Sequence, residues 1–181
     1  MLDLSRTWRP EPDWAEAHLT GPDITIRAIT GLTQRLVSGD LGRFLARYDL
    51  GGDVGGLAVA SGERYAVRLA RDRMLAIGLA PGECADGWHE EGYAVTTVGA
   101  GQRVLEMRGE GLRNLLGRAV TVDPDRAGPS AAIPFGGVTC AVYFHEGPHA
   151  LRVHVERGLA AFLWEWLECQ PLLSEKQVFK A

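Results

Sequence analysis

Alternating hydrophobic and polar residues predict short strands along much of the chain. Ile24 and Ile26 alternate with Thr25 and Arg27, which is the two-residue period of a half-buried strand. The same kind of pattern predicts further strands, at residues 57–61, 64–70, 74–79, 93–98 and 102–108. The polar run 71–73 separates two of them, so we expect a hairpin there.

Three segments instead repeat apolar residues every three or four positions, which predicts helices. Within residues 32–48 the pair Gly39-Asp40 interrupts the pattern, so we expect one broken helix or two short ones, with Asp40 as an N-cap. A short helix is predicted at 110–116. The last helix has the clearest apolar stripe and ends before Pro171; the stripe comprises Leu159, Phe162, Leu163, Trp166 and Leu167.

The order of these elements predicts the fold class. Residues 138–144 and 150–155 form a second predicted hairpin, after a long Pro/Gly connection, while 80–92 reads as a loop or a poor helix. A strand, a helix and two or three strands therefore occur once in each half, and the second copy closes with a helix. We expect an α+β domain in which helices cover an antiparallel sheet, built as two ferredoxin-like (split β-α-β) halves.

The ends of the chain differ from this pattern. Residues 1–22 are rich in Pro, Trp, Asp and Glu without any period, so we expect an N-terminal arm. Residues 23–170 are predicted to form a single domain, and residues 171–181 a C-terminal tail.

Composition and charge narrow the class of protein. At 181 residues, 46% hydrophobic and 23% charged, the chain has the composition of a globular domain with its own core. Its net charge is −4 with the two signs interspersed, which argues against nucleic-acid binding. We find neither a long apolar run nor an export pattern, so we expect a cytoplasmic protein without membrane contact. Three widely spaced cysteines are predicted to be structural: Cys84, Cys140 and Cys169.

One motif suggests a metal site. Residues 145–149, HEGPH, match the H-E-x-x-H spacing that places two zinc-binding imidazoles on one helical face. That chemistry needs a helix, which Gly147 weakens and Pro148 breaks. We therefore predict a hairpin turn at this position and no metal.

The remaining motifs also fail to predict catalysis. Gly109-Glu110-Gly111 lacks the third glycine of a dinucleotide fingerprint, and GGDVGG at 51–56 lacks the Lys-Ser/Thr of a P-loop. No nucleophile elbow is present, and His154 on its strand is expected to face solvent. We nominate no catalytic, cofactor-binding or metal-ligating residue in this chain.

Apolar residues near both ends predict a surface for another protein. Trp164 lies off the stripe of the last helix, and the N-terminal arm carries two further tryptophans. Exposed aromatic and aliphatic groups are typical of protein interfaces. The predicted interface residues are Trp8, Trp14, Trp164, Leu172, Leu173 and Phe179.

Part of the chain resembles a known family. The segments VLEMRGEGLRNLLGRAVTVD and VTCAVYFHEGPHALRVHVERGLAAFLWEWLE, with the earlier hairpin RYAVRLARDRMLAIG, resemble the gamma subunit of heterotetrameric sarcosine oxidase over residues 60–169. The resemblance implies a fold like the folate-binding region of the glycine-cleavage aminomethyltransferase. It also implies larger partner subunits that hold flavin, NAD, zinc and folate and oxidise an amine. Gly55 and Gly56 stand where an aminomethyltransferase has an acidic pair, which argues against transfer activity.

Three hypotheses for the function follow. The chain is a non-catalytic gamma-type subunit that stabilises an amine-oxidising complex, a free-standing folate-binding or one-carbon transfer domain, or an unrelated ferredoxin-like scaffold domain. The fold class by itself does not separate the first from the third.

Overall fold

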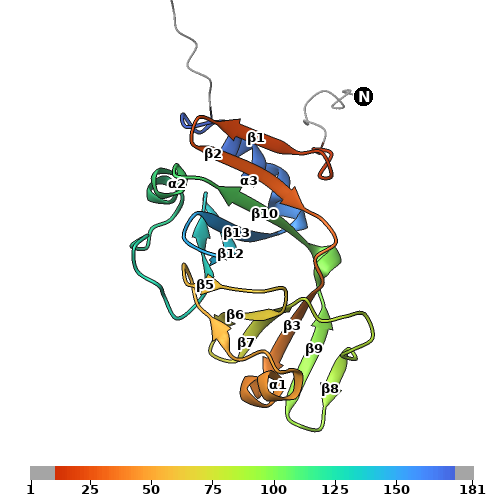
Figure 1. Cartoon of the computed structure of the whole chain (residues 1–181). Helices are drawn as coiled ribbons and strands as arrows, with labels where there is room; N and C mark the ends of the chain where they lie inside the picture. Colours follow the sequence, from red (N-terminus) through yellow and green to blue (C-terminus); the bar gives the residue numbers. More distant parts are fainter. Residues whose placement is uncertain (1–10, 174–181) are drawn as a thin grey trace, which may run out of the picture.

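The computed structural model describes residues 11–173, which form two β-sheets packed face to face (Figure 1). Helices lie on the outer face of each sheet, so the molecule has the layer order helix, sheet, sheet, helix.

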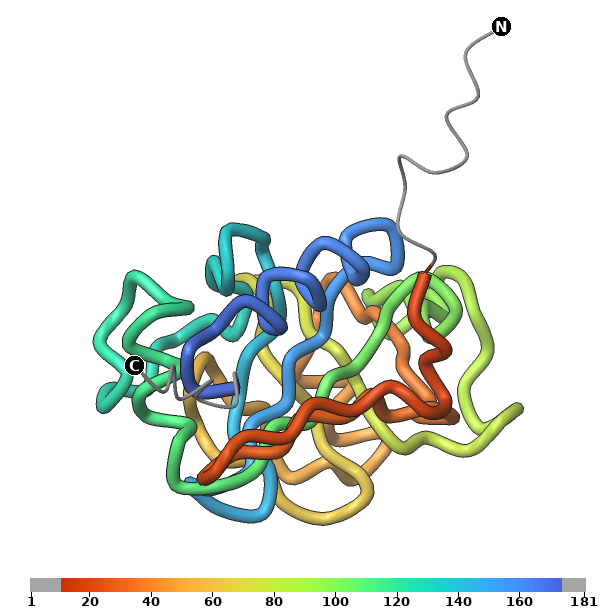
Figure 2. The backbone as a smooth tube through the Cα atoms, turned by 90° about the horizontal axis from the view of Figure 1, so that it is seen from above, coloured from red at the N-terminus to blue at the C-terminus, as the bar shows by residue number. Residues whose placement is uncertain are grey.

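The first sheet carries two helices. Its strands follow the order β1 (His18–Gly21), β2 (Ile24–Ile29), β10 (Gln102–Arg108), β13 (Ala150–Glu156), β12 (Val138–His145) and β11 (Ala132–Phe135), with β5 (Val59–Ala60) beside β12. Neighbours are antiparallel except for β5, which is parallel to β12. The helices are α2 (Leu112–Ala119) and α3 (Arg157–Glu168). Figure 2 shows β1 and β2 running side by side along one edge of the molecule.

The second sheet carries one helix, α1 (Leu41–Tyr48). Its strands follow the order β4 (Asp53–Val54), β6 (Tyr65–Ala70), β7 (Arg73–Ile77), β3 (Gln34–Gly39), β9 (Tyr93–Thr97) and β8 (Gly87–His89). A single 3-10 turn, η1 (Gly99–Gly101), connects this sheet to the first.

The two halves share one topology, which confirms the predicted fold class. In the second sheet the spatial order β6-β7-β3-β9 is that of a ferredoxin-like unit, with α1 following its first strand. The order β12-β13-β10-β2 in the first sheet is the same, with α2 following β10. In the first sheet, the strand that occupies the position of β9 is β2, which precedes the other three strands in the sequence.

Alternating side chains divide the interior into three clusters. On β7, Met74 packs with α1, whereas Leu75 packs between the sheets. On β12, Val142 packs beneath the helices of the first sheet, whereas Tyr143 packs between the sheets. Central strands are therefore buried on both faces, which explains why they lack a polar face in the sequence.

The predicted helix at 32–48 is only half correct. Residues Gln34–Gly39 form β3, which pairs with β7 on one side and β9 on the other. Their apolar side chains have to fill both faces of a central strand, so the spacing imitates a helix. Asp40 is confirmed as the N-cap of α1, because its carboxylate accepts a hydrogen bond of 3.0 Å from the Arg43 backbone N–H.

Four short strands were not predicted: β1, β4, β8 and β11. His18–Gly21 lies in the segment expected to be an arm, yet it pairs with β2 as an edge strand. Ala132–Phe135 lies in the predicted connection before the second hairpin. Its Pro134 is tolerated because β11 is the last strand on its side of the sheet.

The other expected elements are confirmed. The hairpins around residues 71–73 and 145–149 form, and the helix predicted at 110–116 spans Leu112–Ala119. The segment 80–92 is a loop that ends in the short strand β8. Within residues 11–173 no helix is long and apolar enough to cross a membrane.

Candidate functional site

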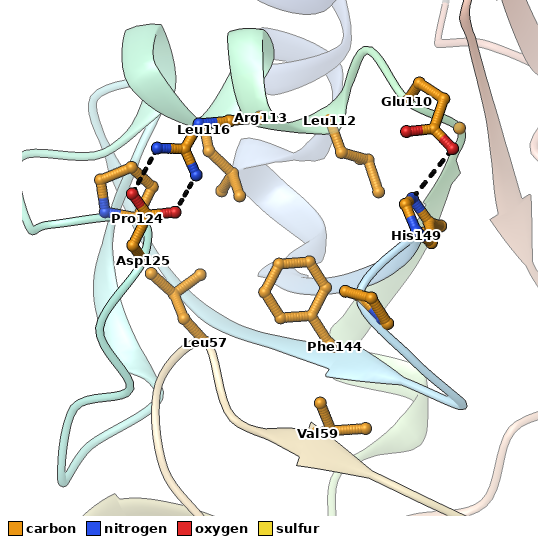
Figure 3. Close-up of a pocket in the computed structure, with 12 residues that line it drawn as sticks. Leu57, Val59, Glu110, Leu112, Arg113, Leu116, Pro124, Asp125, Phe144 and His149 are labelled. Atoms are coloured by element: carbon orange, nitrogen blue, oxygen red, sulfur yellow. Dashed lines mark hydrogen bonds and ion pairs between the residues drawn. The ribbon is translucent and has the colours of Figure 1, made fainter.

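A pocket of about 430 Å³ lies under α2 (Figure 3). We call it the α2 pocket. Its roof is the inner face of α2, and its floor comes from β5 and β12 together with the residues just before β5. The apolar lining consists of Leu57, Val59, Leu112, Leu116, Pro124, Phe144 and Pro148. A concave, mostly apolar cavity of this size is typical of a binding site.

Local backbone geometry places Leu57 in this floor. Leu57 has a φ of 57°, a left-handed conformation that is strained for a branched side chain, and its N–H donates to the Val142 carbonyl at 3.1 Å. A Cβ at Gly55 would overlap the carbonyl oxygen of Gly128, so this glycine lets the two segments touch. The GGDVGG run therefore packs closely against a neighbouring segment and leads into the pocket floor at Leu57.

Charged side chains stand at two ends of the pocket and are already paired. Arg113 on α2 makes a two-pronged ion pair with Asp125. At the opposite end His149 Nδ1 lies 3.4 Å from a Glu110 carboxylate oxygen. These four side chains are largely exposed and form two separate ion pairs. They do not converge on a common point, as the groups of a catalytic site would. The pocket can bind an apolar group, with charged contacts at its mouth.

A second cluster of polar groups is buried between the two sheets. His154 Nδ1 donates to Gln34 Oε1 at 2.6 Å, so Nε2 is the acceptor for the Tyr143 hydroxyl at 2.7 Å. Tyr143 in turn accepts from Tyr65 at 2.9 Å, and Tyr65 accepts from Arg152 at 2.7 Å. All donors in this chain of hydrogen bonds point in one direction, from Arg152 to Gln34. We call it the inter-sheet polar chain.

Glu106 continues this network toward the surface. Its carboxylate is fully buried and is contacted at 2.8 Å by both Arg27 and Arg108, and at 3.4 Å by Arg152. Burial alone would raise the pKa of Glu106, but the hydrogen bonds from Arg108 and Arg27 lower it to about 2. Glu106 is therefore ionised at neutral pH and serves as a common acceptor for three cations.

His154 was predicted to face solvent, and this is wrong. The side chain is 2% exposed, because β13 is a central strand whose second face is covered by the other sheet. Burial, together with the charge of Arg152, lowers the pKa of His154 to about 3. An imidazole that is neutral and shielded from solvent acts as a structural hydrogen-bonding group here.

The HEGPH motif forms the predicted turn. His145 Nε2 contacts the Gly62 carbonyl at 3.0 Å, while His149 points to Glu110 at the α2 pocket, so the two imidazoles have different partners. In the described part of the chain no group of three or more His, Cys, Asp or Glu side chains could hold a metal.

The cysteines differ in their surroundings. Cys84 and Cys140 are buried, and burial raises the pKa of the Cys140 thiol to about 12. Cys169, by contrast, is exposed at the end of α3, because the helix turns another face to the core.

Two predicted interface residues are not exposed. Trp14 and Trp164 are 7% and 4% exposed and pack edge to face with ring centroids 5.8 Å apart. Their apolar surface is buried within the chain, which corrects the prediction. Leu172 and Leu173 are half-buried against the helical core of the first sheet. Trp8 and Phe179 lie outside the described residues.

Other side chains carry the exposed apolar surface. The α3 stripe is rotated from its predicted position, so Leu159 and Phe162 are 40% and 54% exposed. Trp88 on the edge strand β8 is 73% exposed. Sequence reasoning missed these three residues because α3 is apolar around most of its circumference and Trp88 is isolated in a loop-like segment.

The fold and the site define an α+β protein of two stacked split β-α-β halves, in which we identify an apolar pocket but no catalytic constellation among residues 11–173. A sequence model of the sarcosine oxidase, gamma subunit family matches residues 47–171, which is more than half of the chain. The chain therefore belongs to the sarcosine oxidase gamma subunit family, as the resemblance predicted.

Solved structures support the fold. A chain of the heterotetrameric sarcosine oxidase from Corynebacterium sp. U-96, in complex with pyrrole 2-carboxylate, superposes with a TM-score of 0.64 at 15% identity. The match covers 83% of this chain and 85% of that one, so the two chains are of similar length. A search of curated protein sequences gave no significant match.

Proposed function

We propose that this chain is a non-catalytic, gamma-type subunit of a heterotetrameric sarcosine oxidase-like, amine-oxidising flavoenzyme, and that it stabilises the assembly. The observation that carries the proposal is the family match over residues 47–171. The similar fold and length of a chain from a heterotetrameric sarcosine oxidase support it.

The proposal divides the chemistry between subunits. The larger partner subunits would hold the flavin, NAD and folate and would carry out the oxidation, in the cytoplasm. The inter-sheet polar chain supports this division, because His154 is buried and neutral and the buried carboxylate of Glu106 is paired with arginines. We propose neither a nucleic acid nor a membrane as a partner.

The exposed face of α3 is the surface that we assign to docking. Leu159 and Phe162 are three residues apart and so lie side by side on the helix surface. Trp166, which is partly buried against Phe135, extends the same flank. Adjacent large apolar side chains at the surface are typical of a contact with another protein, and an aromatic anchor often dominates its binding energy.

Co-purification from cells that express the tagged chain with the larger subunits tests both claims. We expect the wild-type chain to retain the larger subunits, and Phe162→Asp to reduce their recovery about tenfold, because a carboxylate would be desolvated in the contact. Asp72→Asn, at an exposed position in the turn between β6 and β7 of the other sheet, is the control and should behave as wild type.

The two possible failures are distinguishable. A wild-type chain that emerges alone, while the larger subunits assemble without it, would contradict the proposed function. Normal recovery with Phe162→Asp would contradict only the choice of α3 as the docking surface.

A further inference from the structure

Trp88 is the most exposed large apolar side chain among residues 11–173, at 73%. It lies on β8, which is the last strand on its side of the second sheet. The residue opposite it on β9 is Ala94, whose side chain is too small to cover an indole ring. Figure 1 shows β8 and α3 at opposite ends of the molecule, so Trp88 does not belong to the apolar surface of α3.

The hairpin that carries Trp88 is held in place by its other side chains. The imidazole of His89 stacks on the ring of Tyr93, with centroids 4.7 Å apart, and Tyr93 is fully buried. At the turn of the hairpin, Arg43 of α1 donates a hydrogen bond of 3.1 Å to the Glu91 carbonyl. The backbone around Trp88 is thus fixed while its ring stays uncovered, and a preorganised anchor of this kind binds with a small loss of entropy.

The surroundings of Trp88 favour a cation. A concavity of about 610 Å³ lies beside it and is lined by Arg43, Trp88, His89, Glu90 and Glu91. Glu90 and Glu91 are exposed, and neither carboxylate is paired with a cation among the described residues. Arg43 is already paired with Asp40 at 3.2 Å. Two free carboxylates therefore stand next to an indole whose face attracts cations.

We propose that a basic segment of one of the larger subunits docks on this surface, with an Arg or Lys over the Trp88 indole and close to Glu90 and Glu91. We call these three residues the β8 surface. The inference rests on the proposed function, because the partner is a larger subunit of the same assembly. The chain then makes two separate contacts, an apolar one through α3 and a charged one through β8.

Binding of the full chain to the purified larger subunits, measured at low salt and at about 0.15 M salt, tests the inference. We expect Trp88→Ser, and the double variant Glu90→Gln with Glu91→Gln, each to weaken binding about fivefold at low salt. The double variant should also lose most of the salt dependence, because salt screens the ion pairs that it lacks. All three side chains are exposed, so both variants should keep the wild-type melting temperature.

A matched control removes the same charge elsewhere. Asp23→Asn with Glu63→Gln changes two exposed carboxylates outside the β8 surface, and should bind as the wild-type chain does. An equal loss of affinity in this control would overturn the inference, because the effect would then come from net charge and not from the β8 surface.

Photo-cross-linking identifies the partner segment. With p-benzoylphenylalanine in place of Trp88 in the assembled complex, we expect a cross-link to a peptide of a larger subunit that contains Lys or Arg close to the linked residue. A link to a second copy of this chain, a link to a peptide without basic residues, or no link would overturn the inference.

Failure of the inference is distinguishable from failure of the proposed function. If the wild-type chain does not bind the larger subunits, the proposed function is wrong and the inference fails with it. If the wild-type chain binds and both β8-surface variants bind equally well, only the inference is wrong.

Discussion

At the scale of single residues, the inter-sheet polar chain shows how burial determines the charge state of a side chain. His154 is an acceptor for Tyr143 and a donor to Gln34, an arrangement that only the neutral imidazole can satisfy. Burial also raises the pKa of the Tyr143 hydroxyl, which keeps this group a hydrogen-bond donor. The network joins strands of both sheets, so its charge states affect how the two halves pack.

The pH dependence of stability follows from the low pKa of His154. Above pH 6.5 both the folded and the unfolded chain hold a neutral imidazole, so this group makes no difference. Between pH 6.5 and about 3 only the unfolded chain binds the proton, and the free energy of unfolding falls as the pH falls. We expect this acid-induced fall between pH 6.5 and 5 to be about 2 kcal/mol smaller in His154→Gln than in wild type.

Urea unfolding at pH 7.5, 6.5 and 5 measures this difference. His149→Gln, at an exposed position, is the control and should follow the wild-type curve. If His154→Gln lost stability with acid as steeply as wild type, the buried neutral histidine would not account for the effect.

The ion pairs of the buried Glu106 also contribute to stability. Replacing it by Gln leaves Arg152, which is largely buried, without its carboxylate partner, and also weakens the contacts of Arg27 and Arg108. Since these last two arginines are half exposed, we expect a loss of only about 2 kcal/mol in the free energy of unfolding at pH 7. Glu110→Gln, on the exposed rim of the α2 pocket, should change the same quantity by less than about 0.5 kcal/mol. If both substitutions lowered the free energy of unfolding equally, the Glu106 ion pairs would not contribute as we expect.

At the scale of elements, α3 shows which of its faces contributes to stability. Trp164 is buried against Trp14, whereas Phe162 is exposed on the opposite flank. We expect Trp164→Ala to lower the free energy of unfolding by about 3–5 kcal/mol and Phe162→Ser by less than about 1 kcal/mol. Thermal and urea unfolding of both variants measure this, and a larger loss with Phe162→Ser would mean that the helix faces the core as the sequence stripe predicted.

The sequence predicted most of the strands and helices. For some of them, however, it did not predict which faces are buried. Hairpins with a clear two-residue period and polar turns were predicted correctly, as was the cap at Asp40. The segment 34–39 was misassigned because a strand buried on both faces loses its alternation, and Trp164 was misplaced because α3 offers more than one apolar stripe. In both cases the tertiary neighbours decide, and the local sequence holds no information about them.

The pocket could not have been predicted from the same patterns. Its lining comes from three separate stretches, represented by Leu57, Leu112 and Phe144, that meet only because β5 pairs with β12 beneath α2. None of these leucine and phenylalanine residues carries a local signal that distinguishes a pocket wall from an ordinary core.

At the scale of the whole molecule, two ferredoxin-like halves are stacked so that each sheet covers the other. This leaves helices on the outer faces, and α3 is the helix that presents large apolar side chains to the outside. A chain of this family with a shielded, neutralised polar interior and an apolar outer helix is suited to packing against other subunits.

We propose that the chain stabilises a larger amine-oxidising assembly without taking part in the reaction. The most direct test compares the larger subunits purified with and without this chain, by turnover per bound flavin and by the half-life of that turnover at elevated temperature. We expect similar initial turnover per flavin, within about twofold, and a half-life at least several-fold longer when the chain is present. Equal half-lives, or an intact assembly that is inactive until the chain is added, would contradict it.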